Sequence, residues 1–189
     1  MSKEEDLAKR LLRKLSTYGA PGGPSTAEAA EALHDLGATA SSLGAEWRKK
    51  AEVVLLGTLE ARQPQPLRLY EGAVKGAAAL GTENAGMVLS RWVHAGVRPS
   101  TAREALNGMA ALLQRKGAGG KGTEKMKGAL EEATAHPSGT VRALAAEYLG
   151  THGDAKHLKK LESLATDEGE RYVRNSARRA LEELRRRLP

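Results

Sequence analysis

One repeated segment restricts the fold of this chain more than any other feature of its sequence. The stretch "VRALAAEYLGTHGD" begins at Val141, and "VRNSARRALEEL" begins at Val173, 32 residues later. In both copies the first, fifth and ninth positions are apolar, which is the spacing of one helix face. A fainter copy begins at Ala102, 39 residues before Val141. A helix pair of this size cannot bury such a face alone, so the sequence predicts stacked helix pairs with one continuous core.

The composition favours the same architecture. The chain has no cysteine, phenylalanine or isoleucine, so its apolar volume comes mainly from leucine, alanine and valine. Leucine and alanine lose little freedom in a helix, whereas the β-branched and aromatic residues typical of sheets are scarce. We therefore predict an all-α fold, an α-solenoid of about four to five helical repeats. The lack of cysteine excludes disulfide scaffolds, thiolate metal sites and cysteine nucleophiles.

Glycine, proline and capping residues divide the chain into predicted helices. Ser25 or Thr26 is expected to cap one helix, and Thr101 with Glu104 matches a capping box for another. The predicted helices cover residues 3–16, 26–36, 44–61, 67–80, 83–95, 101–115, 123–136, 138–149, 155–165 and 170–188.

The same boundaries suggest how the chain is organised. Residues 1–24 are expected to form an N-terminal helix and a glycine- and proline-rich hinge, residues 25–99 divergent helical repeats, and residues 100–189 clearer repeats. We expect these parts to form one continuous solenoid domain. No stretch resembles a secretory signal or is long enough to span a bilayer, so we expect a cytoplasmic protein.

The two clear copies share a set of motifs. Val-Arg is followed by small residues and Leu-Gly, then by Gly-Asp, a leucine-spaced second helix, an aspartate and another Val-Arg. These elements are Val141, Arg142, Ala145, Ala146, Leu149, Gly150, Gly153, Asp154, Leu158, Leu161, Asp167, Val173 and Arg174. In this pattern the chain resembles the HEAT-repeat family, especially the short bacterial HEAT-like repeats also found in phycobilin lyases. The resemblance is strongest over residues 137–188.

This resemblance implies a right-handed α-solenoid in which the Val-Arg helices line a concave surface. It also implies a non-catalytic scaffold or adaptor that binds a partner protein through that surface. On this picture Arg103, Arg142 and Arg174 form a row at matching positions of successive helices, and Asn107 and Arg178 lie one turn further on. These five are the predicted partner-binding residues. Guanidinium groups in such a row can bind carboxylates or phosphates. A structural role stays open for Arg142 and Arg174, which can instead brace a neighbouring repeat through a carboxylate or a helix end.

Nucleic-acid binding through a basic concave face is the alternative function. The net charge is +7, and one basic segment, "RKGAGGKGTEK" at residues 115–125, contains a Gly-Lys pair. It lacks the opening glycine and the hydroxyl of a phosphate-binding loop, so we interpret it as a connector between helices. The candidate phosphate contacts in and near it are Arg115, Lys116, Lys121, Lys125 and Lys127. Acidic residues alternate with the basic ones along the helices, which is typical of a solvated surface.

The sequence offers no catalytic, cofactor or metal site. His152, Asp154 and His157 lie on both sides of a predicted turn and do not share the helical spacing of a metal site. Trp47 and Trp92 lie on apolar stripes and are interpreted as core residues, not as platforms for stacked bases. We therefore predict a binding protein and not an enzyme, with another protein as its partner.

Overall fold

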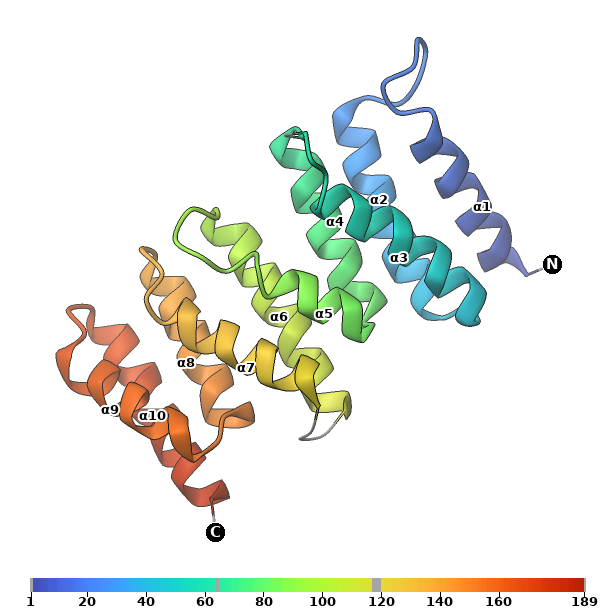
Figure 1. Cartoon of the computed structure of the whole chain (residues 1–189). Coiled ribbons are helices and arrows are strands. Elements are labelled where there is room, and N and C mark those ends of the chain that lie inside the picture. The colour runs from blue at the N-terminus through green and yellow to red at the C-terminus, as the bar shows by residue number, and fades with distance from the viewer. Residues whose placement is uncertain (1, 64, 117–119, 189) are drawn as a thin grey trace. The chain divides into compact units, whose positions relative to one another are not determined.

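The computed structural model describes residues 2–63, 65–116 and 120–188, and within these ranges it contains helices and no strand (Figure 1). The chain divides into two compact units, residues 1–89 and 90–189. In each unit, successive helices pack against one another as expected for helical repeats. The predicted all-α fold of the α-solenoid class is therefore confirmed.

The first unit is built around a close pair of helices. Its described helices are α1 (Lys3–Ser16), α2 (Thr26–Ser41), α3 (Ala45–Leu59), α4 (Leu67–Leu80) and α5 (Glu83–Leu89). The α2 and α4 helices make the most extensive contact, α1 packs on α2, and α3 packs on both α2 and α4. A methyl group at Gly37 would lie 2.0 Å from the Gly76 carbonyl oxygen, so these two helices approach backbone to backbone.

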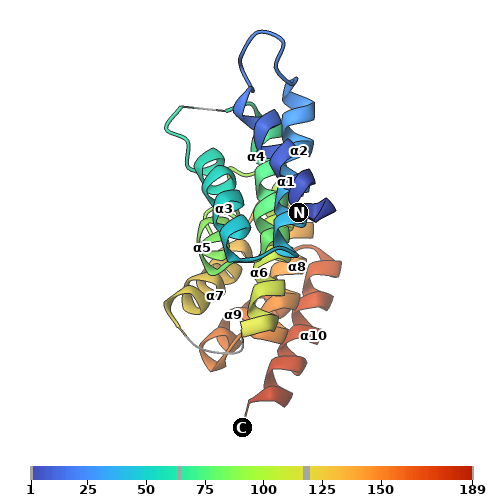
Figure 2. The same cartoon turned by 90° about the vertical axis from the view of Figure 1, so that its right-hand side faces the viewer.

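The second unit contains the segment with the clear sequence repeats. Its described helices are α6 (Pro99–Lys116), α7 (Lys121–Ala133), α8 (Gly139–His152), the short 3-10 helix η1 (Ala155–His157), α9 (Leu158–Asp167) and α10 (Arg171–Arg187). Within this unit α8 packs between α6 and α10, while α7 lies against α6 and α8 and α9 lies against α10 (Figures 1 and 2). The α6, α8 and α10 helices therefore form one layer of the unit, and α7 and α9 form the other.

The repeated apolar stripe faces the core, as the sequence predicts. Val141, Ala145, Leu149, Val173 and Ala177 are all fully buried. The ninth position of the second copy is Leu181, which is only half-buried, and Leu184 one turn later is fully buried. The buried stripe thus shifts from Leu181 to Leu184 in the second half of α10. None of the described helices combines the length and apolar character needed to cross a membrane.

Several predicted helix ends are wrong. The ends predicted at residues 136 and 149 lie at Ala133 and His152 instead, and two other ends are further off. The α2 helix does not stop at Leu36 but continues to Ser41, because Gly37 inside it fits against the α4 backbone. The helix predicted over residues 83–95 ends at Leu89 instead. Beyond it, the His94 ring accepts a hydrogen bond from the Gly96 amide at 3.1 Å. A side chain that satisfies nearby backbone groups in this way competes with helix formation.

The capping predictions gave one correct and one wrong result. Ser25 caps α2 in a capping box with Glu28, as expected. No cap forms at Thr101, because α6 begins two residues earlier at Pro99, a residue whose fixed φ suits the first helical position. The Thr101 hydroxyl is buried, with no hydrogen-bond partner among the described residues.

The tryptophans also differ from expectation, since both are half-buried and not fully buried. The Trp47 side chain is a hydrogen-bond partner of Glu5, and Lys50 Nζ lies 4.8 Å from the centre of its ring. Trp92 follows α5 in the turn region and does not lie on a helical stripe.

Candidate functional site

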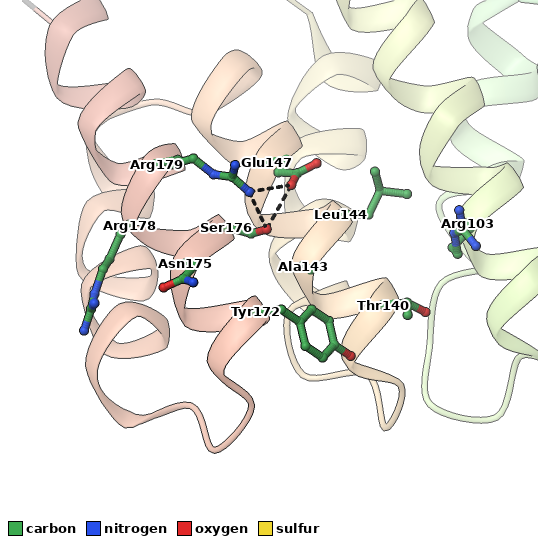
Figure 3. Close-up of a pocket in the computed structure, with 10 residues that line it drawn as sticks. All are labelled: Arg103, Thr140, Ala143, Leu144, Glu147, Tyr172, Asn175, Ser176, Arg178 and Arg179. Carbon is green, nitrogen blue, oxygen red and sulfur yellow. Dashed lines mark hydrogen bonds and ion pairs between the residues drawn. The ribbon is translucent and has the colours of Figure 1, made fainter.

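A groove of about 770 Å³ opens on the α6, α8 and α10 layer of the second unit (Figure 3). All the residues that line it come from these three helices, and we call it the α6/α8/α10 groove. They are Arg103 on α6, Thr140, Ala143, Leu144 and Glu147 on α8, and Tyr172, Asn175, Ser176, Arg178 and Arg179 on α10. The groove therefore combines cationic, polar and apolar surface.

Helical periodicity explains why these side chains gather. On α8 the buried positions Val141, Ala145 and Leu149 lie on one face of the helix. The groove residues of α8 lie on the opposite face, which therefore forms the groove wall. The two main walls lie close together because Gly150 on α8 meets Ala180 on α10. A methyl group at Gly150 would lie 2.7 Å from the Ala180 Cα atom.

The groove carries more positive than negative charge. Glu147 is its only carboxylate among the described residues, and its Oε1 accepts a hydrogen bond from Ser176 Oγ at 2.9 Å. Arg179 Nη2 lies 3.8 Å from the same oxygen, and the Arg179 side chain is 74% exposed. Arg103 and Arg178 make no hydrogen bond or ion pair within the described part of the chain, so their donors face solvent.

Tyr172 provides the large exposed apolar surface at the groove, with 46% of the residue accessible. A hydrogen bond from its hydroxyl to Glu170 is the main reason why the pKa of Tyr172 is raised. A methyl group at Gly139 would lie 2.2 Å from the Tyr172 hydroxyl oxygen. Glycine at this position therefore leaves the space in which the tyrosine lies at the start of α8.

Arg142, at the start of α8, is fully engaged inside the protein. Nε and Nη2 donate to the two carboxylate oxygens of Glu168 at 2.7 and 2.9 Å, and Nη2 also donates to Glu170 at 2.7 Å. Nη1 donates to the carbonyl oxygens of His136 and Pro137, both at 2.9 Å. All five N–H groups of a guanidinium are used in this way. Hydrogen bonding to Arg142 is the main cause that lowers the pKa of Glu168.

Arg174 repeats part of this geometry one repeat later. Its Nη1 donates to the carbonyl oxygens of Glu168 and Gly169 at 2.6 and 2.9 Å. Arg142 and Arg174 thus each bind the carbonyls six and five residues before them. Both hold the turn that leads into their own helix, and Arg142 also ties α8 to the turn before α10.

The comparison with family models agrees with this repeated geometry. Residues 98–182 match the model for HEAT repeats. This segment belongs to the HEAT-repeat family. The match includes the fainter copy at Ala102 and begins well before residue 137, where the sequence resemblance becomes strongest. HEAT repeats generally act as protein-interaction scaffolds and are typically non-catalytic. The comparison with curated proteins found no match to the chain.

Within the HEAT segment, the predicted arginine row is divided between two places. Arg103 and Arg178 line the α6/α8/α10 groove, whereas Arg142 and Arg174 are not among the described residues that line it. Asn107 accepts a hydrogen bond from the Tyr148 hydroxyl at 2.7 Å, and this contact links α6 to α8. Burial is the largest of the causes that raise the pKa of Tyr148.

The candidate phosphate contacts lie at another part of the HEAT segment. Arg115 is exposed near the end of α6, and Lys121 and Lys125 are exposed on the first turns of α7. The side chain of Lys116 and residues 117–119 lie outside the described part of the chain. Among the described residues that line the groove, none belongs to this set.

Lys127 differs from the other lysines of that set because its side chain is only 9% exposed. Its Nζ lies 3.3 Å from Asp154 Oδ2 and 3.7 Å from Glu124 Oε1. Asp154 in turn donates its backbone N–H to His157 Nδ1 at 3.0 Å. Lys127 therefore joins α7 to the turn before η1, and the contact between Asp154 and His157 holds that turn.

Sequence reasoning missed several groove residues, namely Thr140, Glu147, Tyr172, Asn175, Ser176 and Arg179. The signal that could have found them is their spacing. On α10 they recur three and four residues apart, opposite the buried Val173 stripe. In the described part of the chain, no three acidic, histidine or cysteine residues gather as a metal ion would require.

Proposed function

We propose that this chain is a non-catalytic HEAT-repeat scaffold or adaptor that binds another protein through the α6/α8/α10 groove. The observation that carries the proposal is the groove itself, which lies within the HEAT segment and presents unpaired arginines beside an exposed tyrosine. Arginine and tyrosine are enriched among the residues that contribute most to protein interfaces. The lack of cysteine fits the reducing cytoplasm, which is the location we propose.

The packing around the groove supports the same function. Arg142 holds the turn before α10 against α8, and Gly150 allows the two helices to approach closely. A surface held in this way loses little conformational freedom when a partner binds, so more of the contact energy appears as affinity. Arg142 and Arg174, which sequence reasoning placed at the interface, thus have a supporting role in the proposal.

Nucleic-acid binding is less well supported by the geometry. A nucleic-acid surface needs a continuous series of cations along a phosphate backbone. The groove contains Glu147 between its cations, and the exposed Arg115, Lys121 and Lys125 do not line it. Fluorescence anisotropy of labelled DNA and RNA tests this alternative. Tight binding that survives near-physiological salt would favour it over the adaptor function.

Affinity capture with a blocked groove tests the proposal directly. Asn175→Trp adds a large uncharged side chain at an exposed groove position on α10, and Thr166→Trp makes a similar change at an exposed position on α9. We expect the wild type and Thr166→Trp to capture the same protein at near-physiological salt, and Asn175→Trp to lose it. No reproducible captured protein, or equal capture by all three chains, would argue against the groove as the binding site.

A further inference from the structure

We propose that the occupant of the α6/α8/α10 groove is an acidic peptide segment of the partner, with carboxylates on both sides of an apolar residue. This inference rests on the proposed function and specifies its partner. It follows from the charge of the groove, from the sides on which its cations lie and from the apolar surface between them.

The charge of the groove selects for negative ligands. Three guanidinium groups line it, from Arg103, Arg178 and Arg179, against the single described carboxylate of Glu147. Arg103 and Arg178 have no hydrogen bond or ion pair within the described residues. A guanidinium group matches a carboxylate in shape and can donate two parallel hydrogen bonds to it. Complementary charge of this kind sets specificity and raises the association rate.

Figure 3 places these cations on two sides of the groove. Arg103 projects from α6 at one side, whereas Arg178 and Arg179 project from α10 at the other. The α8 residues Ala143 and Leu144 lie between them, with Tyr172 at the α10 side. An extended ligand that reaches both sides would place an apolar group over the α8 surface. A peptide with acidic, apolar and acidic side chains in succession meets all three requirements.

Glu147 adds a feature of specificity. Its carboxylate lies beside Arg179 and is held by Ser176, so it partly neutralises one of the two α10 arginines. A ligand carboxylate near Arg179 is repelled by Glu147, which favours pairing of that ligand group with Arg178. Replacing the carboxylate by an amide removes this repulsion and keeps the acceptor for Ser176. Glu147→Gln should therefore bind acidic peptides more tightly by about threefold to tenfold.

The test uses selection from a library of short random-sequence peptides, followed by anisotropy with synthetic copies of the selected peptides. The groove variant carries Arg103→Glu, Arg178→Glu and Arg179→Glu. The control variant carries Arg115→Glu, Lys121→Glu and Lys125→Glu, which change the total charge equally at exposed positions outside the groove. All six positions are exposed, so both variants should keep the circular dichroism spectrum and melting temperature of the wild type.

We expect the wild type and the control variant to select peptides rich in Asp and Glu around an apolar residue. Those peptides should bind the groove variant at least about tenfold more weakly. If the selected peptides do not bind Asn175→Trp but show no preference for acidic residues, this inference is overturned and the proposed function stays in place. Failure to select any peptide, or binding that Asn175→Trp does not change, would overturn both. If an oligonucleotide binds the wild type at near-physiological salt but does not bind the groove variant, the groove binds nucleic acid, and the inference of a peptide ligand is overturned.

Discussion

Removing the Arg142 guanidinium tests the main claim about how the HEAT segment is held together. Its side chain is 14% exposed and that of Glu168 is 10% exposed, so this ion pair is largely shielded from solvent. Arg142→Ala would leave the Glu168 carboxylate without its guanidinium donors and two backbone carbonyls without theirs. Removing one partner of a buried ion pair costs about 3–5 kcal/mol. Glu168 keeps a hydrogen bond from the Glu170 amide, so we expect the lower end, about 3 kcal/mol.

Arg174→Ala is the matched control for this prediction. Arg174 occupies the same repeat position but donates to two carbonyl oxygens and to no carboxylate in the described residues. Removing its side chain should lower the free energy of unfolding by about 1 kcal/mol, the net contribution of an ordinary hydrogen bond. The double variant Arg142→Ala with Glu168→Gln should lose less free energy of unfolding than the two single variants lose together, because it contains no unpaired carboxylate at residue 168.

Urea unfolding followed by tryptophan fluorescence can resolve these differences. The chain has two tryptophans, Trp47 in the first unit and Trp92 in the second. A Trp47→Phe background therefore makes fluorescence report on the unit that contains Arg142. If Arg142→Ala lowers the free energy of unfolding by no more than Arg174→Ala does, the reasoning is refuted, since the contact with the Glu168 carboxylate would then contribute nothing to stability.

Three further predictions concern the pH response of Glu168, two glycines of the first unit and Tyr172. The pKa of Glu168 lies below its ordinary value of 4.5, mainly because a guanidinium donates to it. Its contribution to stability is therefore complete above about pH 4.5 and is lost as the pH falls through the lowered pKa, so urea midpoints measured down to about pH 3 should fall less for Glu168→Gln than for the wild type. Gly37→Ala should destabilise the first unit by about 1–3 kcal/mol, because its methyl group would meet the backbone of α4. Gly57→Ala meets no atom within 4 Å in the same unit and should stabilise it by about 0.5–1 kcal/mol, and equal thermal shifts for the two variants would contradict the close packing of α2 and α4. Tyr172→Ala removes a half-exposed ring, so it should weaken binding of selected peptides by about tenfold in anisotropy while the urea midpoint stays close to that of the wild type.

The fold class could be predicted from the sequence because its signal is periodic. The stripes that begin at Val141 and Val173 set the helix faces, and the helix boundaries at residues 67–80 agree with α4. The wrong boundaries depend on contacts that a local pattern does not contain. The predicted helix over residues 26–36 stops before Gly37, but contact with another glycine keeps Gly37 inside α2. The division into residues 1–24, 25–99 and 100–189 remains a prediction.

The candidate site was harder to predict because equivalent residues have different surroundings. Arg142 and Arg178 both belong to the predicted arginine row, yet one binds five acceptors and the other binds none in the described residues. The difference depends on Glu168 and on the turn carbonyls, which approach only in the folded unit. The place of the Tyr172 hydroxyl beside Gly139 is likewise a feature of the folded unit, which the spacing of the α10 residues does not show.

The most direct test of the proposed binding site is an NMR titration of the ¹⁵N-labelled full chain with a peptide selected by the wild type. The proposed site predicts amide shift changes centred on the α8 and α10 residues of the groove, around Glu147, Tyr172 and Asn175. It also predicts that Asn175→Trp abolishes these changes and Thr166→Trp preserves them. Shift changes confined to α7 and α9, or equal changes in both variants, would contradict the assignment of the α6/α8/α10 groove as the partner-binding site.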